Sequence, residues 1–246
     1  MWKRLQSGFG LTDEKYSAHT LERVLGEYLG ETRLGELLKP CLVTAYDITR
    51  REARFFNSAD VATKKLGPSR DFYVRDVARA TSAAPTYFEP ANIAAMDRSV
   101  YSLVDGGVFA NNPTMCACVE AFSLQPKLQV TDLTVLSLGT GQEDKPYHYS
   151  EAKGWGQVEW IHPVIGIMMS GVAETVDYEL RMLFQSAGCP DNYLRLQVDL
   201  QKFPQVDGTM DHASEKNMRA LEEVGRIVAE ENDAKLEAMA ERLMAD

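Results

Sequence analysis

The stretch SLVDGGVFANNP, residues 102–113, constrains the fold more than any other part of the chain. A short apolar run, residues 101–104, ends at Asp105, and Gly106 and Gly107 follow at once. This order predicts a buried strand that ends in an acid, followed by a turn in which glycine permits unusual backbone angles or close approach of another group. Taken alone, the pattern fits two structures equally well: an α/β sheet with its chemistry at a strand end, and an Asp-Gly-Gly turn on a surface hairpin.

The residues that follow favour the α/β sheet over the hairpin. Asn111, Asn112 and Pro113 end the loop, and proline suits the first turn of a helix predicted over residues 114–124. A second apolar run closed by glycines, LTVLSLGTG at residues 133–141, starts about 30 residues after the first. A strand, a helix and a strand at this spacing are typical of a βαβ unit.

Together these stretches resemble the patatin-like family of lipid acyl hydrolases. The resemblance rests first on LVDGGV at residues 103–108, on Asn112-Pro113 and on LSLGTG at residues 136–141. Further patches in the family's order are GETRL (30–34), VTAYDI (43–48), ATSAAPTYF (80–88), NYLRLQ (192–197) and MDHASEKNM (210–218). The similarity runs from about residue 8 to about residue 228.

The resemblance implies a three-layer α/β/α fold with a mainly parallel central sheet and a serine–aspartate dyad. Asp105 matches the dyad aspartate, and Gly106, Gly107, Asn112 and Pro113 match the motif that supports it. The family implies no cofactor and no metal. The sequence itself also argues against a metal site, because the Cys-Ala-Cys spacing at residues 116–118 suits neither a disulfide nor the usual zinc pair.

A nucleophile is missing from the sequence. Serine hydrolases of α/β folds present their serine in a Gly-x-Ser-x-Gly turn, and none of the 13 serines has that setting. In the patatin-like family the serine motif and the glycine-rich oxyanion loop precede the patches matched here. We therefore expect the chain to correspond to the C-terminal two-thirds of such a protein, without the N-terminal strands. An open, apolar sheet edge would remain, to be covered by the missing segment or by a second chain.

Several functions remain open at this stage. In the first, the chain is the aspartate half of an acyl hydrolase that acts on phospholipid or galactolipid esters, and it does not hydrolyse them by itself. In the second, it is a non-catalytic remnant or a lipid- or protein-binding module on the same fold. A nucleotide-binding role for the loop at residues 139–141 is weaker, because that loop lacks the third glycine of a dinucleotide motif and the lysine of a P-loop.

Composition limits the partners and the compartment. With 246 residues the chain is long enough for a single domain over residues 1–246, and its net charge of −10 argues against nucleic acid and anionic membranes. Transient contact with a lipid surface through apolar side chains stays open. No run of 18 apolar residues and no signal peptide is found. We expect a cytoplasmic protein, with secretion that uses no cleaved signal as the alternative.

Periodicity predicts the remaining elements. Strands are expected at residues 41–48, 51–57 and 193–200, the first two as an antiparallel pair. We expect residues 41–48, 101–104 and 133–138 to share one sheet with helices on both faces. Helices are predicted over residues 18–29, 60–66, 72–82, 163–185 and 214–228, with a further amphipathic helix over residues 230–246. The methionines of residues 163–185 are interpreted as core, with a lipid pocket as the alternative.

Overall fold

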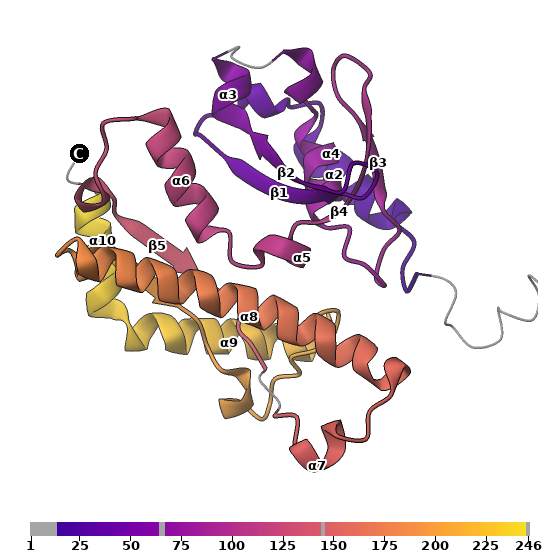
Figure 1. Ribbon diagram of the computed structural model, residues 1–246, viewed down its shortest axis with the longest axis vertical. Helices are drawn as coiled ribbons and strands as arrows, with labels where there is room; N and C mark the ends of the chain where they lie inside the picture. Colours follow the sequence, from indigo (N-terminus) through magenta and orange to yellow (C-terminus); the bar gives the residue numbers. More distant parts are fainter. Residues whose placement is uncertain (1–13, 64–66, 144–145, 245–246) are drawn as a thin grey trace, which may run out of the picture. The chain divides into compact units, whose positions relative to one another are not determined.

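The computed structural model describes residues 14–63, 67–143 and 146–244 (Figure 1). The chain forms two compact units. The first contains the residues up to Pro113 together with residues 168–173, and the second contains residues 114–167 and the residues from 174 onward. The prediction of a single domain over residues 1–246 stays a prediction, because close packing within each unit does not measure whether that unit folds alone.

The first unit is built on a four-stranded sheet. Its strands are β1 (Leu42–Asp47), β2 (Glu52–Asn57), β3 (Ala91–Ala94) and β4 (Val100–Asp105), and its helices are α2 (His19–Leu29), α3 (Ser58–Ala62), α4 (Val74–Thr81) and α5 (Gly107–Ala110). Two 3₁₀ turns, η1 (Leu34–Glu36) and η2 (Pro68–Arg70), connect them. The mixed α/β class predicted from the sequence is confirmed, as is the antiparallel pairing of residues 42–47 with residues 52–57.

The predicted mainly parallel sheet is wrong for this unit. The strand order is β2-β1-β4-β3, and every neighbouring pair is antiparallel. Strand β4 lies in the middle, with Ala45 of β1 opposite Asp105 and Ala91 of β3 opposite Leu103. Because both edges of β4 are occupied, the strand that contains Leu136 cannot pair with it. Leu103 and Leu136 lie in different sheets, so the expectation that they share one is also wrong.

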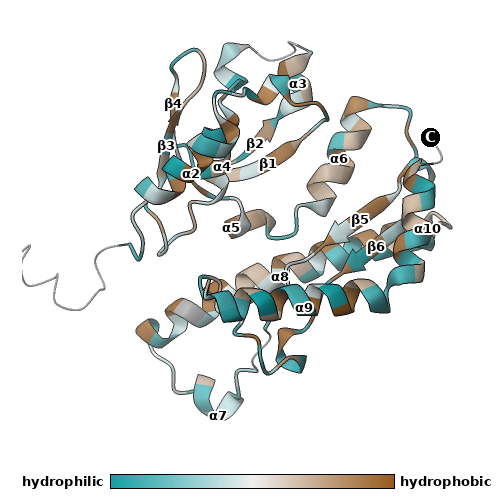
Figure 2. Cartoon of the chain, turned by 180° about the vertical axis from the view of Figure 1, so that it is seen from behind, coloured by the Kyte–Doolittle hydropathy of each residue, from teal (hydrophilic) through white to brown (hydrophobic). Residues whose placement is uncertain are grey.

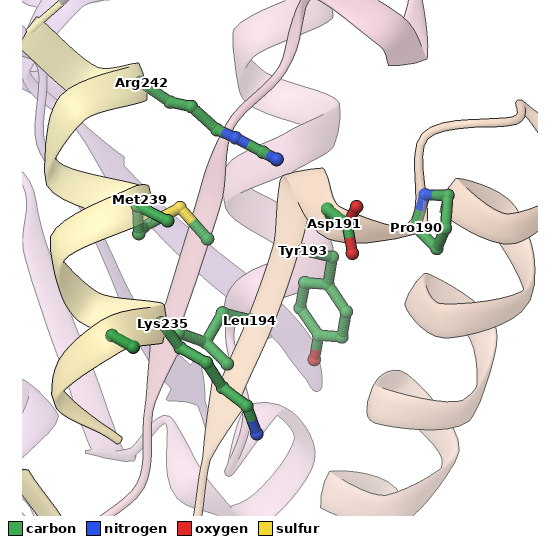
Figure 3. A pocket seen from close by; sticks show the side chains of 9 residues that line it. Pro190, Asp191, Tyr193, Leu194, Lys235, Met239 and Arg242 are labelled. Carbon is green, nitrogen blue, oxygen red and sulfur yellow. The ribbon is translucent and has the colours of Figure 1, made fainter.

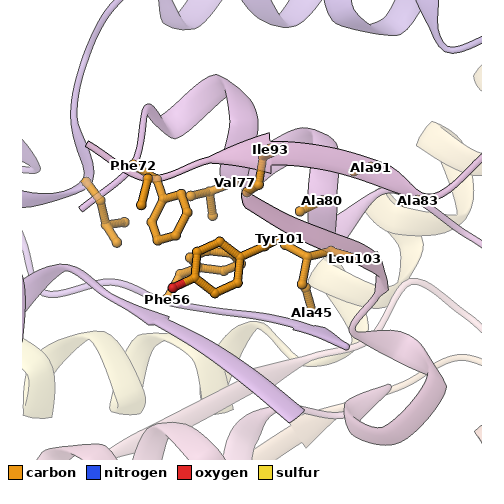
Figure 4. Packing of buried hydrophobic residues seen from close by; sticks show 12 residues of the cluster. Ala45, Phe56, Phe72, Val77, Ala80, Ala83, Ala91, Ile93, Tyr101 and Leu103 are labelled. Carbon is orange, nitrogen blue, oxygen red and sulfur yellow. The ribbon is translucent and has the colours of Figure 1, made fainter. Parts of the chain in front are cut away.

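The core of the first unit lies between this sheet and α4 (Figure 4). Alternate residues of β4 point into it, so Tyr101 and Leu103 are buried whereas Ser102 and Val104 are only half-buried. The ring of Phe72 packs edge-on against Phe56 at 5.0 Å and against Tyr101 at 5.4 Å. Complete burial of side chains of this size contributes about 1.5–3 kcal/mol each, so this cluster holds β4 and its terminal acid in place.

The opposite face of the sheet carries the short helix α5, which the sequence analysis interpreted as loop. The ring of Phe109 lies 6.3 Å from Tyr46 and 5.8 Å from Phe55. Tyr46 follows the buried Ala45 in β1, so it points away from the α4 side. Helix α5 is thus tied to the sheet directly after the Asp-Gly-Gly turn.

The second unit contains a parallel strand pair, whereas the sequence analysis expected the parallel sheet to include residues 101–104. Its strands are β5 (Val135–Leu138) and β6 (Tyr193–Leu196), and its helices are α6 (Thr114–Leu124), α7 (Tyr149–Ala152), α8 (Gln157–Ser186), α9 (Glu215–Glu231) and α10 (Asp233–Met244). Residues 168–173 of α8 belong to the first unit. The 3₁₀ turns are η3 (Val130–Asp132), η4 (Pro190–Asn192) and η5 (Leu200–Lys202). Strands β5 and β6 pair in parallel, and α8 lies in the connection between them. The βαβ unit is therefore β5-α8-β6 and not the strand pair that flanks α6.

Helices α6 and α8 pack on one face of this strand pair. Leu180 and Phe184 of α8 are fully buried, and Phe184 stacks on Tyr193 at 5.8 Å. Cys118 of α6 belongs to the same cluster. The predicted helix over residues 114–124 is confirmed at both ends.

Nearer the start of α8 the prediction of a buried apolar stripe is only partly correct. Leu180 is core, but Ile165 and Met168 are 42% and 58% exposed. Figure 2 shows apolar residues along α8. Within the described part of the chain, no helix, the 30-residue α8 included, is long and apolar enough to cross a bilayer.

Helix ends account for most remaining differences. Ser214 caps α9 by accepting a hydrogen bond from the N–H of Asn217 at 3.3 Å. The C-terminal helix is divided, because α9 ends at Asn232, whose side chain donates to the carbonyl of Val228, and α10 begins at the next residue. Residues 1–13 and 64–66, for which a loop and a helix end were expected, lie outside the described residues.

Candidate functional site

Asp105 is the last residue of β4, as the sequence predicts. Its backbone N–H donates to the carbonyl of Ala83 at 3.0 Å, which ties the end of the strand to the segment that follows α4. One carboxylate oxygen, Oδ1, accepts the N–H of Gly107 at 2.7 Å. Among the described residues none donates to the other oxygen, Oδ2. The carboxylate is therefore held by one oxygen, and the second oxygen can accept another proton donor.

The surroundings of Asp105 change its acidity. The side chain is half-buried, and burial raises the pKa of the carboxyl above its ordinary value. The N–H of Gly107 offsets part of this rise. A carboxylate with a raised pKa accepts a proton more readily than an exposed one. The site is thus suited to general base chemistry.

Gly106 is required by close approach and not by an unusual backbone angle. Its φ and ψ are −66° and −20°, which any residue adopts, so the predicted special conformation is wrong. A Cβ built on Gly106 would overlap both oxygens of Thr44 and would lie 2.5 Å from the carbonyl carbon of that residue. The predicted tight backbone contact is therefore confirmed. Thr44 itself is fixed, because Thr81 Oγ1 of α4 donates to its carbonyl at 2.8 Å.

Gly107 provides both the donor to Asp105 and the space beside it. A Cβ at this position would lie 3.1 Å from Asp105 Oδ1 and 3.7 Å from Met169 Cε. The first distance is shorter than ordinary packing allows, so a side chain would displace the carboxylate. Its backbone, like that of Gly106, has no positive φ.

The asparagines after α5 hold the end of the motif. Asn112 is almost completely buried, and its Nδ2 donates to the carbonyl of Ala173 at 3.3 Å. Asn111 Nδ2 donates to the carbonyl of Met169 at 3.4 Å. Pro113 stands directly before α6, as predicted. The motif Asp-Gly-Gly and the pair Asn112-Pro113 thus belong to one local arrangement within the first unit.

The sequence analysis missed Thr44, and it placed Asn111 at the end of the loop without an anchoring role. Thr44 limits residue 106 to glycine, and Asn111 anchors the loop, yet each lies in a pattern that suggests only a strand residue or a turn. A strand pattern such as VTAYDI does not indicate which residue its backbone meets, so no signal in the sequence marked Thr44. Asn111 stands next to Asn112 in the family motif, which is a weak signal.

Ser137 is a buried serine whose hydroxyl contacts two other polar side chains. It is 3% exposed, and its Oγ lies 2.6 Å from Thr114 Oγ1 and accepts a hydrogen bond from Arg195 Nη1 at 2.9 Å. No histidine or carboxylate is among these partners. These hydrogen bonds connect α6, β5 and β6 within the second unit. We therefore interpret Ser137 as a residue that stabilises the fold. No group of three His, Cys, Asp or Glu side chains in the described residues could hold a metal ion.

Comparison with known proteins agrees with the motif. The family model for patatin-like phospholipase matches residues 1–117. The chain is 30% identical to "Patatin-like protein 2" of Oryza sativa subsp. indica over 247 residues, 91% of this chain and 60% of the rice protein. It is 31% identical to "Patatin-like protein 1" of Arabidopsis thaliana, over 87% of this chain and 56% of that protein.

A potato relative is matched over a larger share of its length. The chain is 32% identical over 257 residues to "Probable inactive patatin-3-Kuras 1" of Solanum tuberosum, which is 96% of this chain and 67% of the potato protein. The chain spans about 60% of the length of the rice relatives that it matches. From these matches and the motif around Asp105, the chain belongs to the patatin-like phospholipase family, a family of lipid acyl hydrolases.

Proposed function

We propose that this chain contributes Asp105 to a serine–aspartate dyad that hydrolyses lipid esters, with a serine that lies outside these 246 residues. The observation that carries the proposal is the setting of Asp105. Its Oδ1 accepts the N–H of Gly107, no described residue donates to its Oδ2, and burial raises its pKa. Family membership supports lipid acyl hydrolysis at the level of the family.

In the proposed reaction, Oδ2 of Asp105 accepts the proton of the serine hydroxyl as the serine oxygen attacks the ester carbonyl. The tetrahedral intermediate collapses, the bond to the alcohol breaks, and the proton moves from Asp105 to the departing alcohol oxygen. Water then attacks the acyl-serine while Asp105 accepts a proton from it, the bond to the serine oxygen breaks, the proton moves from Asp105 to that oxygen, and the fatty acid is released. The N–H of Gly107 keeps the carboxylate oriented through both steps. The substrates are esters of phospholipids or galactolipids.

The second candidate is a non-catalytic member of the same family, retained as a lipid- or protein-binding module. Two observations favour it. No serine of the chain stands in a Gly-x-Ser-x-Gly sequence, and one matched relative carries a name that calls it probable inactive. Under this hypothesis Asp105 remains as a structural residue.

We also propose that residues 147–165 touch the lipid surface. Trp155 lies edge-on against Tyr147 at 5.3 Å and against Trp160 at 5.0 Å. Exposed aliphatic side chains follow on the first turns of α8, among them Val158, which is 74% exposed. Tryptophan and tyrosine are enriched where an apolar phase meets water.

The charges of this surface favour an uncharged or zwitterionic lipid. Lys153 stands between Glu151 and Glu159 in the sequence, so this surface carries both signs and has no excess of positive charge. A surface for anionic lipids would carry an excess of lysine and arginine. Phosphatidylcholine and galactolipid surfaces meet this condition.

A further part of the proposal concerns the two-stranded sheet. Among the described residues β5 and β6 pair only with each other, and a sheet of two strands is marginal by itself. Leu138 at the end of β5 is 66% exposed. We propose that a strand from an upstream segment of the same protein pairs with this sheet; a stable dimer of this chain in solution would instead indicate a second copy.

We further propose a cytoplasmic location. The four cysteines are free thiols, which are typical of proteins in a reducing compartment.

The experiment is an ester-hydrolysis assay on three proteins. The first is this chain, the second is the chain extended upstream through the serine motif, and the third is the extended chain with Asp105→Asn. We expect turnover only in the second, because an asparagine cannot accept the serine proton. Asp97→Asn is the matched control, since Asp97 is an exposed acid in the loop between β3 and β4 and should leave turnover unchanged.

Each other result has a definite reading. If the reading frame upstream contains no Gly-x-Ser-x-Gly and the chain alone is inactive, the non-catalytic candidate stands. Turnover by this chain alone that Asp105→Asn abolishes would show that one of its own serines is the nucleophile. Equal turnover by the extended chain and its Asp105→Asn variant would remove Asp105 from the mechanism.

A further inference from the structure

A pocket of about 470 Å³ lies between β6 and α10 in the second unit (Figure 3). Its size falls in the range typical of small-molecule sites, about 300–1,000 Å³. None of its lining residues belongs to the motif around Asp105. The sequence analysis treated α10 only as an amphipathic packing helix, so neither the motif nor the periodicity accounts for this pocket.

The charged side chains of the pocket do not neutralise one another. Lys235 and Arg242 extend from α10 with Met239 between them, and Asp191 of η4 also lines the pocket (Figure 3). Arg242 is engaged, since its Nη1 donates to Asn192 Oδ1 at 2.8 Å. Lys235 forms no side-chain hydrogen bond or ion pair with any described residue. The chain has a net charge of −10, so most of its charged surface repels anions. The unpaired ammonium group of the exposed Lys235 makes the pocket a place where an anion is attracted.

The two ends of the pocket therefore differ. Figure 3 shows the guanidinium of Arg242 directed toward the side of Asp191, with the ammonium group of Lys235 at the opposite end. The acid and the hydrogen bond to Asn192 reduce the attraction of the Arg242 end for an anion. The Lys235 end has no such compensation.

Between these ends the lining is apolar. Met239 is 3% exposed and Tyr193 is 8% exposed, and Leu194 of β6 lies across from α10. The hydroxyl of Tyr193 is already used, because it donates to Asp177 Oδ1 at 2.8 Å. The small side chains of Ala234 and Ala238 leave the space open. Seven residues of helix separate Lys235 from Arg242, about 10 Å of length, which suits an alkyl chain of medium length.

We propose that this pocket binds a medium-chain fatty-acid anion, with the carboxylate at Lys235 and the alkyl chain on Leu194 and Met239. The choice of a fatty acid rests on the proposed function, because hydrolysis of a lipid ester releases one. The ammonium group supplies a charge-assisted hydrogen bond to the carboxylate. The apolar lining removes the alkyl chain from water.

Calorimetric titration of the full chain with decanoate, below the concentration at which decanoate forms micelles, tests the proposal. Decyl glucoside has the same chain with an uncharged head, and butyrate has the same head without the chain. We expect decanoate to bind at one site and both analogues to bind at least tenfold more weakly, since a charge-assisted hydrogen bond and a buried chain each contribute about that factor.

Variants identify the pocket. Lys235→Gln should weaken decanoate binding about tenfold and leave the weak binding of decyl glucoside unchanged. Ala238→Phe should abolish decanoate binding by filling the space, without removing a charge. Lys202→Gln is the matched control, because Lys202 is an exposed lysine of η5 outside the pocket. Unfolding curves of all variants establish that they are folded.

The results that would overturn the fatty-acid site differ from the results that would overturn the serine–aspartate dyad. Equal affinity for decanoate and decyl glucoside, or full affinity in Lys235→Gln or in a folded Ala238→Phe, would overturn the fatty-acid site. Binding requires neither a serine nor Asp105, so Asp105→Asn should bind decanoate like the wild type. Absence of ester hydrolysis by the extended chain that carries both the serine motif and Asp105, with intact decanoate binding, would therefore contradict the proposed function and leave this pocket in place.

Discussion

The carbonyl carbon of Thr44 lies 2.5 Å from the position that a Cβ on Gly106 would occupy. No real Cβ tolerates that distance, and Thr44 cannot retreat freely because its carbonyl accepts a hydrogen bond from Thr81. Strand β1 and the turn after β4 are thereby locked together at the residue that follows Asp105.

Gly106→Ala should therefore lower the free energy of unfolding by about 1–3 kcal/mol, the usual range for forced overpacking. Gly26→Ala is the matched control, since Gly26 lies inside α2 and nothing stands within 4 Å of its added Cβ. That control should gain about 0.5–1 kcal/mol from better helix propensity. Urea unfolding of both variants measures the difference. An unchanged midpoint for Gly106→Ala would contradict the close contact.

Asp105→Asn should stabilise the protein at neutral pH. Burial raises the pKa of Asp105 in the folded protein, so the carboxyl loses its proton more easily in the unfolded chain. The free energy of unfolding should fall as pH rises from the ordinary pKa of 3.8 toward the folded pKa, and stay lower above it. Asparagine carries no charge and still accepts the N–H of Gly107.

Thermal unfolding between pH 3 and pH 8 tests this expectation. The variant should have the higher midpoint at pH 7, and the difference should shrink toward pH 3. Asp97→Asn provides a control of opposite sign, because the backbone and side chain of Ser99 lower the pKa of Asp97 by hydrogen bonding to its carboxylate. A midpoint for Asp105→Asn below that of the wild type at pH 7 would mean that the ionised carboxylate has a stabilising partner.

Ser137→Ala should destabilise the second unit without affecting hydrolysis by the extended protein. The change leaves Thr114 Oγ1 and Arg195 Nη1 without their shared partner, which should cost about 1–3 kcal/mol. Ser123→Ala is the control, since Ser123 is exposed near the end of α6 and should stay within about 0.5 kcal/mol of the wild type. Loss of hydrolysis in a folded Ser137→Ala protein would instead identify Ser137 as the nucleophile.

Val158→Glu should reduce attachment to lipid without reducing stability. Val158 is exposed near the start of α8, where a negative charge is favourable to the helix. Losing the transfer of one valine to lipid, about 1.5 kcal/mol, corresponds to about tenfold weaker binding. Sedimentation with phosphatidylcholine or galactolipid vesicles measures it. Val119→Glu on α6, also at an exposed valine, should bind like the wild type. Equal binding by both variants would place the lipid contact elsewhere.

The local elements and the family follow from short stretches of the sequence. Helix α6 occupies residues 114–124 as predicted, Asp105 ends its strand, and residues 42–57 form the predicted hairpin. These features depend on contacts between residues close in the chain, so periodicity, proline and turn residues are sufficient to reveal them. The motif from Asp105 to Pro113 identified the family because its members preserve the same short order of residues.

The pairing of the strands and the need for glycine at residue 106 become evident only in the folded chain. The direction of β4 depends on β1, which lies far from it in sequence, and on β3, which directly precedes it in the chain; together the two strands occupy both of its edges. An apolar run has the same pattern in a parallel and in an antiparallel sheet, so the sequence could not distinguish them. In the same way, the glycine at 106 is required by the backbone of Thr44, 62 residues earlier. Such a requirement arises only when the chain is folded, because it is a contact between distant segments.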